Sequence, residues 1–146
     1  MEWIPHITVA AVIEKEQRFL LVEEESDGLI VFNQPAGHWD PGETLIEAAI
    51  RETLEETAWH FKPEAIVGLY AYTSPLNQIT YLRLCFCGPV YDHQPQQSLD
   101  TGILRTVWLT REEVCQKNNL RSPMVLQAIE DYLNDKRYPL SLLTML

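Results

Sequence analysis

Three glutamates, Glu52, Glu55 and Glu56, stand three and four residues apart near the middle of the chain. In an α-helix these spacings place side chains on one face, within an arc of about 100°. Like charges at such spacings destabilise a helix, by about 0.2–0.5 kcal/mol per pair. Carboxylate oxygens are the ligands that Mg²⁺ prefers, and Mg²⁺ completes its shell with waters and substrate phosphates. The trio is therefore either a hard-cation site or a solvated acidic helix face, and helix spacing alone does not decide between them.

The segment that carries the trio has the signals of an α-helix from Thr44 to Thr57. Thr44 and Glu47 form a capping-box signature, and Pro41-Gly42 stands just upstream. One side of this helix is expected to face the core, and its residues are Ile46, Ala49, Ile50, Thr53 and Leu54. The glutamates lie on the other side.

The residues around the trio follow a fixed pattern. The chain reads Gly37, five residues, Glu43, seven residues, Arg51-Glu52, two residues, and Glu55-Glu56. This pattern resembles the Nudix box, a loop–helix–loop signature of the MutT-like phosphate-anhydride hydrolases. The glutamates match the metal-binding positions of that box.

Two positions depart from the box. Thr53 stands where an aliphatic residue is usual, and Ala58 stands where glycine is usual. A left-handed alanine costs roughly 1 kcal/mol more than a left-handed glycine. We therefore expect the helix to continue in the right-handed region at Ala58. Both departures concern the packing and the end of the helix rather than metal binding.

The resemblance continues outside the box, in residues 32–38, 119–123 and 137–140, which are similar to a phosphatase subgroup of the family. It implies an α/β fold, a Nudix-type α/β/α sandwich with a central mixed β-sheet. It also implies a dependence on Mg²⁺, for which Mn²⁺ is a possible substitute. The implied substrates are small di- and triphosphates, namely nucleoside tri- and diphosphates and the pyrophosphate of the thiamine pyrimidine precursor. Two alternatives stay open: an ordinary Nudix nucleotide pyrophosphohydrolase that releases pyrophosphate or nucleoside monophosphate, and a non-catalytic Nudix-fold module that binds metal or nucleotide.

The box also implies roles for its other residues. Gly37 matches the first glycine of the box, where the lack of a Cβ permits a close approach or a positive φ. Glu43 and Arg51 match a structural pair that orients the loop against the helix, and Arg51 and Glu52 count among the catalytic candidates. Family members differ in their general base. Glu55 is the first candidate here, and Asp100, in the loop before a strand at Leu104, is the second.

Substrate contacts are less specific in the sequence. Aromatic rings stack on heterocycles but more often fill cores, and the candidates are Phe32, Tyr72 and Tyr81. Asn33 and Gln34 are candidates to read a ring edge. Arg83 stands in an otherwise apolar strand, so it needs an anion, either a partner carboxylate or a substrate phosphate.

The rest of the chain alternates strand and helix patterns. Residues 6–14 and 18–23 predict a hairpin. Further strands are predicted through Val31 and Phe32 and at 66–73, 79–88 and 104–109, with helices after Thr110 and Ser122. Helices on both faces would bury a mixed sheet.

Composition sets the wider limits. A chain of 146 residues with 46% hydrophobic residues fits one globular domain, residues 1–146. The net charge of −10 disfavours duplex nucleic acid, and an RNA-decapping hydrolase with it. We expect no membrane segment, a cytoplasmic location and a monomer, with an oligomer left open. The three cysteines, Cys85, Cys87 and Cys115, suggest neither a disulfide framework nor a zinc site.

Overall fold

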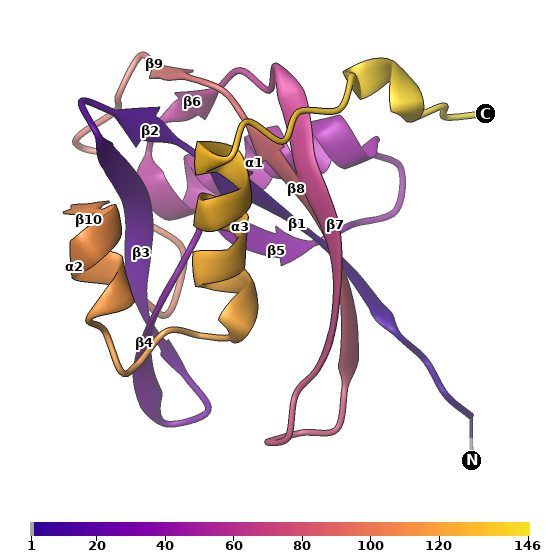
Figure 1. Ribbon diagram of the computed structural model, residues 1–146, viewed down its shortest axis with the longest axis horizontal. Coiled ribbons are helices and arrows are strands. Elements are labelled where there is room, and N and C mark those ends of the chain that lie inside the picture. The colour runs from indigo at the N-terminus through magenta and orange to yellow at the C-terminus, as the bar shows by residue number, and fades with distance from the viewer. Residues whose placement is uncertain (1) are drawn as a thin grey trace.

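The computed structural model describes residues 2–146. Its helices and strands follow one another along the chain as drawn in Figure 1. The elements are β1 (His6–Val12), β2 (Glu14–Lys15), β3 (Arg18–Ser26), β4 (Leu29–Asn33), β5 (Ala36–His38), α1 (Leu45–Thr57), β6 (His60–Phe61), β7 (Ala65–Thr73), β8 (Thr80–Cys87), β9 (Val90–Tyr91), β10 (Ile103–Thr110), α2 (Arg111–Cys115), α3 (Pro123–Leu133) and a 3₁₀ turn, η1 (Leu140–Leu142).

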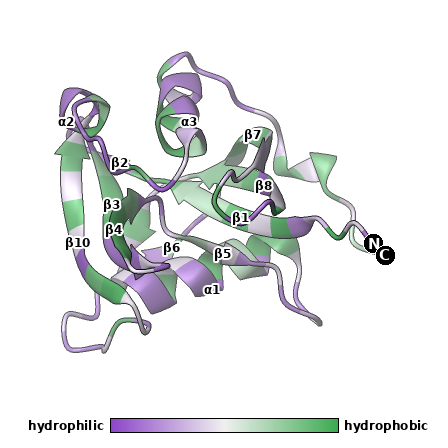
Figure 2. Cartoon of the chain, turned by 90° about the horizontal axis from the view of Figure 1, so that it is seen from below, coloured by the Kyte–Doolittle hydropathy of each residue, from purple (hydrophilic) through white to green (hydrophobic). Residues whose placement is uncertain are grey.

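A four-stranded mixed sheet forms the centre of the fold, with the strand order β5-β1-β8-β7. β1 runs parallel to β8, and the other neighbours are antiparallel. β1 is apolar on both faces, since Val9 and Ala11 pack with α1 while Ala10 and Val12 pack with α3. Figure 2 shows α1 and α3 on opposite sides of these strands. The expected α/β/α sandwich with a central mixed sheet is confirmed.

A second sheet stands beside the first. β3 is its central strand and pairs with β2, β4 and β10, always antiparallel. Phe19 and Leu21 of β3 join the cluster under α3, and Leu20 joins the cluster under α1. Both sheets therefore contribute to each of the two core clusters, one under α1 and one under α3.

The hairpin predicted between residues 6–14 and 18–23 is wrong in most of its length. Only residues 13–15 pair with residues 18–20, whereas β1 pairs with β5 and β8. The physical reason is that β1 is buried on both faces, and such a strand needs neighbours within the layered sheet. The strands predicted at 66–73, 79–88 and 104–109 are β7, β8 and β10, each within one residue at either end.

The predicted cap of α1 is confirmed. Thr44 Oγ1 accepts a hydrogen bond from the Glu47 amide at 3.0 Å, and Glu47 Oε1 accepts one from the Thr44 amide at 2.8 Å. These two bonds satisfy amide groups that have no partner inside the helix.

Among residues 2–146, no helix is long and apolar enough to cross a membrane.

The predicted core stripe of α1 is only partly correct. Ala49 and Thr53 are fully buried, but Ile50 and Leu54 stay partly exposed. Glu56 is buried in their place, with 8% of its surface exposed. The reason is that β5 packs on the acidic side of α1, and helix periodicity alone does not include that contact.

Ala58 follows α1 in the left-handed conformation, with φ 62° and ψ 16°. The expectation that the helix continues in the right-handed region here is wrong. The Ala58 amide donates to the Leu54 carbonyl at 2.9 Å, and the Ala58 carbonyl accepts from the Gln94 amide at 2.8 Å. Contacts on both sides therefore hold this residue in its strained backbone conformation.

We predict that Ala58→Gly stabilises the protein by about 0.5 kcal/mol. Relief of left-handed strain contributes roughly 1–2 kcal/mol, and the loss of a buried methyl group costs about 0.8 kcal/mol. Ala49→Gly is the matched control, because Ala49 is equally buried but lies inside α1, so glycine there should destabilise. Chemical denaturation measures both changes, and a destabilised Ala58→Gly protein would refute the prediction.

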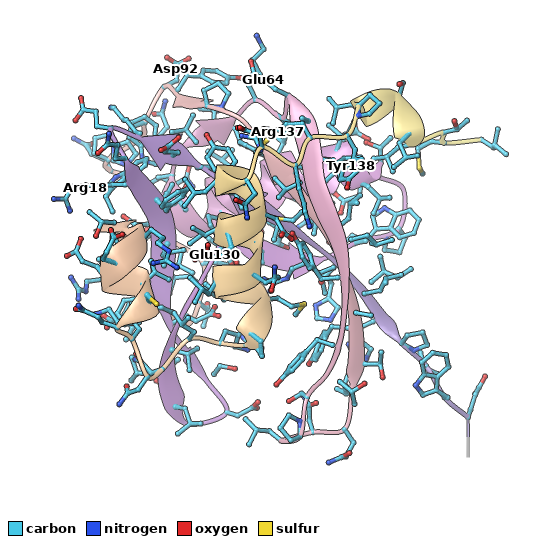
Figure 3. The ribbon with its side chains drawn as sticks, in the orientation of Figure 1. Arg18, Glu64, Asp92, Glu130, Arg137 and Tyr138 are labelled. Carbon is cyan, nitrogen blue, oxygen red and sulfur yellow. The ribbon has the colours of Figure 1, made fainter. Side chains whose placement is uncertain are left out.

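The segment after α3 crosses the edge strand β7. Tyr138 and Ile66 exchange two backbone hydrogen bonds of 2.8 Å, and Figure 3 shows Tyr138 beside β7. Asp131, near the end of α3, accepts a hydrogen bond of 2.7 Å from the hydroxyl of Tyr70 on β7. Lys136 Nζ lies 3.2 Å from the same carboxylate. These contacts fasten α3 to the sheet.

The pH dependence of stability tests the Asp131 contact. Burial raises the pKa of Asp131, but hydrogen bonds from Tyr70, Lys136 and Gln127 outweigh it and hold the pKa below its ordinary value. A lowered pKa gives stability that is complete above about pH 4 and is lost as the pH falls through the folded value. We predict that Asp131→Asn destabilises by about 1–2 kcal/mol at neutral pH. Denaturant titrations should show this difference shrinking as the pH falls below about 4, and an equal difference at every pH would contradict the account.

Candidate active site

A cavity of ≈ 470 Å³ opens beside the mixed sheet. Two hairpins form its walls, β3–β4 and β7–β8, and their tips project to the same side of the molecule in Figure 1. Thr8 of β1 and Arg83 of β8 lie in its floor, on the sheet face that α3 covers further along. Gly37, Glu52 and Glu56 line the end of the cavity next to α1. The cavity therefore joins the acidic face of α1 to the sheet.

Glu52, which lines this cavity, converges with Glu55 and Asp100, which are not among its lining residues. One carboxylate oxygen from each lies within 4.8 Å of the other two. Asp100 reaches the helix because its amide donates to the Glu55 carbonyl at 2.9 Å, and Gln97 Nε2 donates to the Leu54 carbonyl at 2.7 Å. The structure thus brings the two candidates for the general base to the same point.

Glu56 lies on the inner side of α1 and is not part of that convergent group. Its Oε1 accepts a hydrogen bond of 2.9 Å from the Ala36 amide. Burial raises the pKa of Glu56 to about 9, although the hydrogen bond from Ala36 opposes the shift. A bound cation is the kind of partner that would favour the charged form of this carboxyl.

Gly37 makes the close approach of β5 to α1 possible. A Cβ at this position would overlap the carboxylate of Glu52. Positive φ is not the reason for the glycine, because the glycines with positive φ among the described residues are Gly28, Gly42 and Gly102. Burial raises the pKa of Glu52, and the hydrogen bond from Arg51 opposes that rise.

Arg51 stands at the centre of an ion-pair network. Its Nε and NH2 donate to the two carboxylate oxygens of Glu43, at 2.9 and 2.8 Å. Its NH1 donates to Glu52 at 2.7 Å and to Glu55 at 3.3 Å. The hydrogen bond to Glu43 raises the pKa of Arg51, and the same bond lowers the pKa of Glu43. The network offsets part of the repulsion between the glutamates and ties the loop before α1 to the helix.

Arg83 is 6% exposed and has no carboxylate partner within 4.0 Å among residues 2–146. Its NH1 donates at 3.3 Å to two neutral oxygens, Asn33 Oδ1 and Gln34 Oε1. Its Nε is buried and has no partner. Burial lowers the pKa of Arg83. Of the two anions that the sequence left open for this side chain, the partner carboxylate is absent.

The other substrate candidates divide between cavity and core. Asn33, Tyr72 and Tyr81 line the cavity, and the two tyrosines are direct cross-strand neighbours. Phe32 does not line it, because its ring is 4% exposed and packs in the core under α3. Gln34 is 1% exposed, binds Arg83 and the backbone of α3, and does not line the cavity either. The predicted substrate contacts of Phe32 and Gln34 stay predictions.

Sequence reasoning missed several residues that line the cavity, namely Thr8, Glu24, His38 and Arg121. Glu24 Oε1 accepts a hydrogen bond of 2.8 Å from Arg121 NH1, and no local pattern links two residues so far apart in the chain. Burial and the neighbouring His6, whose Nδ1 lies 3.0 Å from His38 Nε2, lower the pKa of His38. Thr8 had a signal, since it is a lone hydroxyl in an apolar strand.

Comparisons with known proteins agree with this geometry. The model of the NUDIX domain family matches residues 4–128. The chain is 40% identical over 139 residues to the phosphatase NudJ of Escherichia coli K12, an alignment that covers 95% of this chain and 90% of that protein. Among solved structures, a NUDIX hydrolase from Nitrosomonas europaea is 48% identical, with a TM-score of 0.96 and 98% of both chains covered. The MutT protein of Methanosarcina mazei Go1, at 23% identity, a TM-score of 0.75 and coverage of 93% and 99%, shares the fold.

The family-model match spans most of the chain, and the identity to NudJ extends over nearly all of it. Both agree with the box pattern from Gly37 to Glu56 and with the α/β/α architecture. The resemblance predicted from the sequence is confirmed, and the chain belongs to the Nudix family of hydrolases, enzymes that act on phosphate anhydrides.

Proposed function

We propose that the protein is a magnesium-dependent hydrolase of phosphate anhydride bonds in small di- and triphosphates. The proposed substrates are nucleoside tri- and diphosphates and the pyrophosphate of the thiamine pyrimidine precursor. One observation carries this proposal. The same cavity has Glu52 and Glu56 of α1 at one end and, in its floor, Arg83, which has no carboxylate partner among the described residues. The likeness to the phosphatase NudJ supports the choice of substrate class.

The residues present fit Mg²⁺. Glu52, Glu55 and Asp100 offer carboxylate oxygens within 4.8 Å of one another, and oxygen ligands suit Mg²⁺ or Mn²⁺. Glu56, which shares the cavity wall with Glu52, is the further proposed ligand. A bound Mg²⁺ neutralises charge on a phosphoryl oxygen and acidifies a coordinated water. A net charge of −10 repels a polyanionic substrate, and such a cation would offset part of that repulsion.

Glu55 is our first candidate for the general base, and Asp100 is the second. Glu55 carries the weaker of the two hydrogen bonds from Arg51 NH1, 3.3 Å against 2.7 Å to Glu52, and its side chain is 42% exposed. A carboxylate that is accessible and only weakly paired is free to take a proton from water. Arg51 then acts by holding Glu52 and Glu55 in place.

The substrate's ring is proposed to lie on Tyr72 and Tyr81, with Asn33 at the cavity wall and Arg83 facing a phosphate. Stacking on a tyrosine accepts many heterocycles, whereas hydrogen bonds to a ring edge discriminate sharply. We therefore expect a permissive enzyme. The intact set from Arg51 to Glu56 speaks against a non-catalytic module.

We also propose that residues 1–146 form one domain and that the protein is a monomer. We propose that it acts in the cytoplasm, on small molecules rather than on duplex nucleic acid. The free thiols of Cys85, Cys87 and Cys115 and the acidic net charge support them.

A phosphate-release screen tests the proposal. With Mg²⁺, the wild-type protein should release inorganic phosphate stepwise from nucleoside tri- and diphosphates and from small pyrophosphates, and EDTA should stop the release. Glu56→Gln should abolish turnover and leave the fold intact or slightly more stable, because it replaces a buried carboxyl by a neutral amide of nearly the same shape. Glu64→Gln, an exposed change away from the cavity, is the control.

The products decide between the candidates. Nucleoside monophosphate and pyrophosphate from triphosphates would identify an ordinary Nudix pyrophosphohydrolase. Wild-type activity in Glu56→Gln at saturating Mg²⁺ would remove Glu56 from the ligand set. No cleavage of any nucleotide or small pyrophosphate would refute the enzyme proposal.

A further inference from the structure

The floor of the cavity consists of two rows of side chains that cross the mixed sheet. In the inner row, Thr8 of β1 lies between His38 of β5 and Arg83 of β8. In the outer row, Tyr81 of β8 faces Tyr72 of β7. All five side chains line the cavity. The inner row is polar and the outer row is aromatic.

Two donors in the inner row have no partner. Thr8 Oγ1 and Arg83 Nε are both buried without a hydrogen bond, and each residue is 6% exposed. Thr8 and Arg83 are register partners on adjacent parallel strands, whose backbones lie about 4.8 Å apart. A buried polar group without a partner costs about 1–3 kcal/mol. Two such donors side by side in a cavity floor indicate a binding site in which a ligand accepts the missing hydrogen bonds.

The charge of Arg83 defines the kind of ligand. The only acceptors of its guanidinium among the described residues are neutral amide oxygens, Asn33 Oδ1 and Gln34 Oε1. Gln34 is fixed in this role, because its Nε2 donates to the Val125 carbonyl at 2.7 Å. The nearby carboxylate of Glu24 is already paired with Arg121 at 2.8 Å. A buried cation with neutral partners only requires an anion from the ligand.

We propose that Thr8 and Arg83 form a phosphate-binding subsite, separate from the cation site on α1. This inference rests on the proposed function and deepens it. The Thr8 hydroxyl and the Arg83 Nε–H each donate to oxygens of one phosphoryl group, while the neighbouring phosphoryl group faces the carboxylates of Glu52 and Glu56. The substrate class is therefore a compound with at least two adjacent phosphoryl groups, and a monophosphate cannot occupy both places.

The two rows also orient the substrate. Tyr81 stands two residues before Arg83 on β8, so the rows lie about 6–7 Å apart. That step suits a phosphoryl group in the inner row and a heteroaromatic ring in the outer row. The ring end then points toward the hairpin tips, where Leu29 and Leu76 line the cavity.

Pyrophosphate binding in EDTA, followed by calorimetry, tests the subsite without metal and without turnover. Thr8→Val removes only the hydroxyl. Thr53→Val is the matched control, because Thr53 Oγ1 is equally buried and unpartnered but does not line the cavity. Arg83→Lys is a second variant that keeps the charge and removes the Nε donor. Thermal unfolding checks that each variant is folded, and the KM for a nucleoside diphosphate with Mg²⁺ is measured in parallel.

We expect Thr8→Val and Arg83→Lys each to weaken pyrophosphate binding about tenfold and to raise KM by a similar factor, with Thr53→Val like the wild type. Wild-type binding in Thr8→Val, or no pyrophosphate binding by the wild type in EDTA, would overturn the subsite. If these changes in binding occur while no anhydride is hydrolysed, the subsite stands and the proposed hydrolase function fails. If both variants hydrolyse the diphosphate with unchanged KM, the hydrolase function stands and the subsite fails.

Discussion

The close approach of the Ala36–Gly37 backbone to the acidic face of α1 is the constraint on which the site depends. It buries Glu56 under the Ala36 amide and presses Glu52 against a residue that can have no Cβ. Both carboxyls lose water, and burial raises the pKa of each. Burial disfavours the ionised form of both carboxyls, and a bound cation would favour it. Metal binding at this position would therefore offset the free-energy cost of burying them.

The rest of the structure supports that approach from two directions. Arg51 links Glu43, Glu52 and Glu55, and it lowers the repulsion that the helix would otherwise carry. The loop before β10 is hydrogen-bonded to the last turn of α1 and places Asp100 beside Glu52 and Glu55. On the sheet, Arg83 of β8 contributes a buried positive charge in the floor of the cavity. In the proposed function, an anhydride with two phosphoryl groups would lie between the cation site and the buried arginine, so that both offset the negative charge of the protein.

Local signals predicted the parts of this site that sequence neighbours determine. The cap at Thr44 and the limits of β7, β8 and β10 depend on short-range patterns, and the structure agrees with them. Long-range packing decided the rest. The burial of Glu56, the left-handed Ala58 held by Gln94 and the core position of Phe32 follow from segments far away in the chain. Helix periodicity carries no information about such contacts.

The central claim is that carboxylates of α1 hold the catalytic cation at the edge of the cavity. A crystal structure with Mn²⁺ and a non-hydrolysable diphosphate, recorded at a wavelength where manganese scatters anomalously, tests it directly. The account predicts an anomalous peak bound about 2.1 Å from oxygens of Glu52 and of Glu55 or Glu56, with a phosphoryl oxygen completing the shell. A peak located away from α1, or a diphosphate bound with no manganese between it and the helix, would contradict the claim.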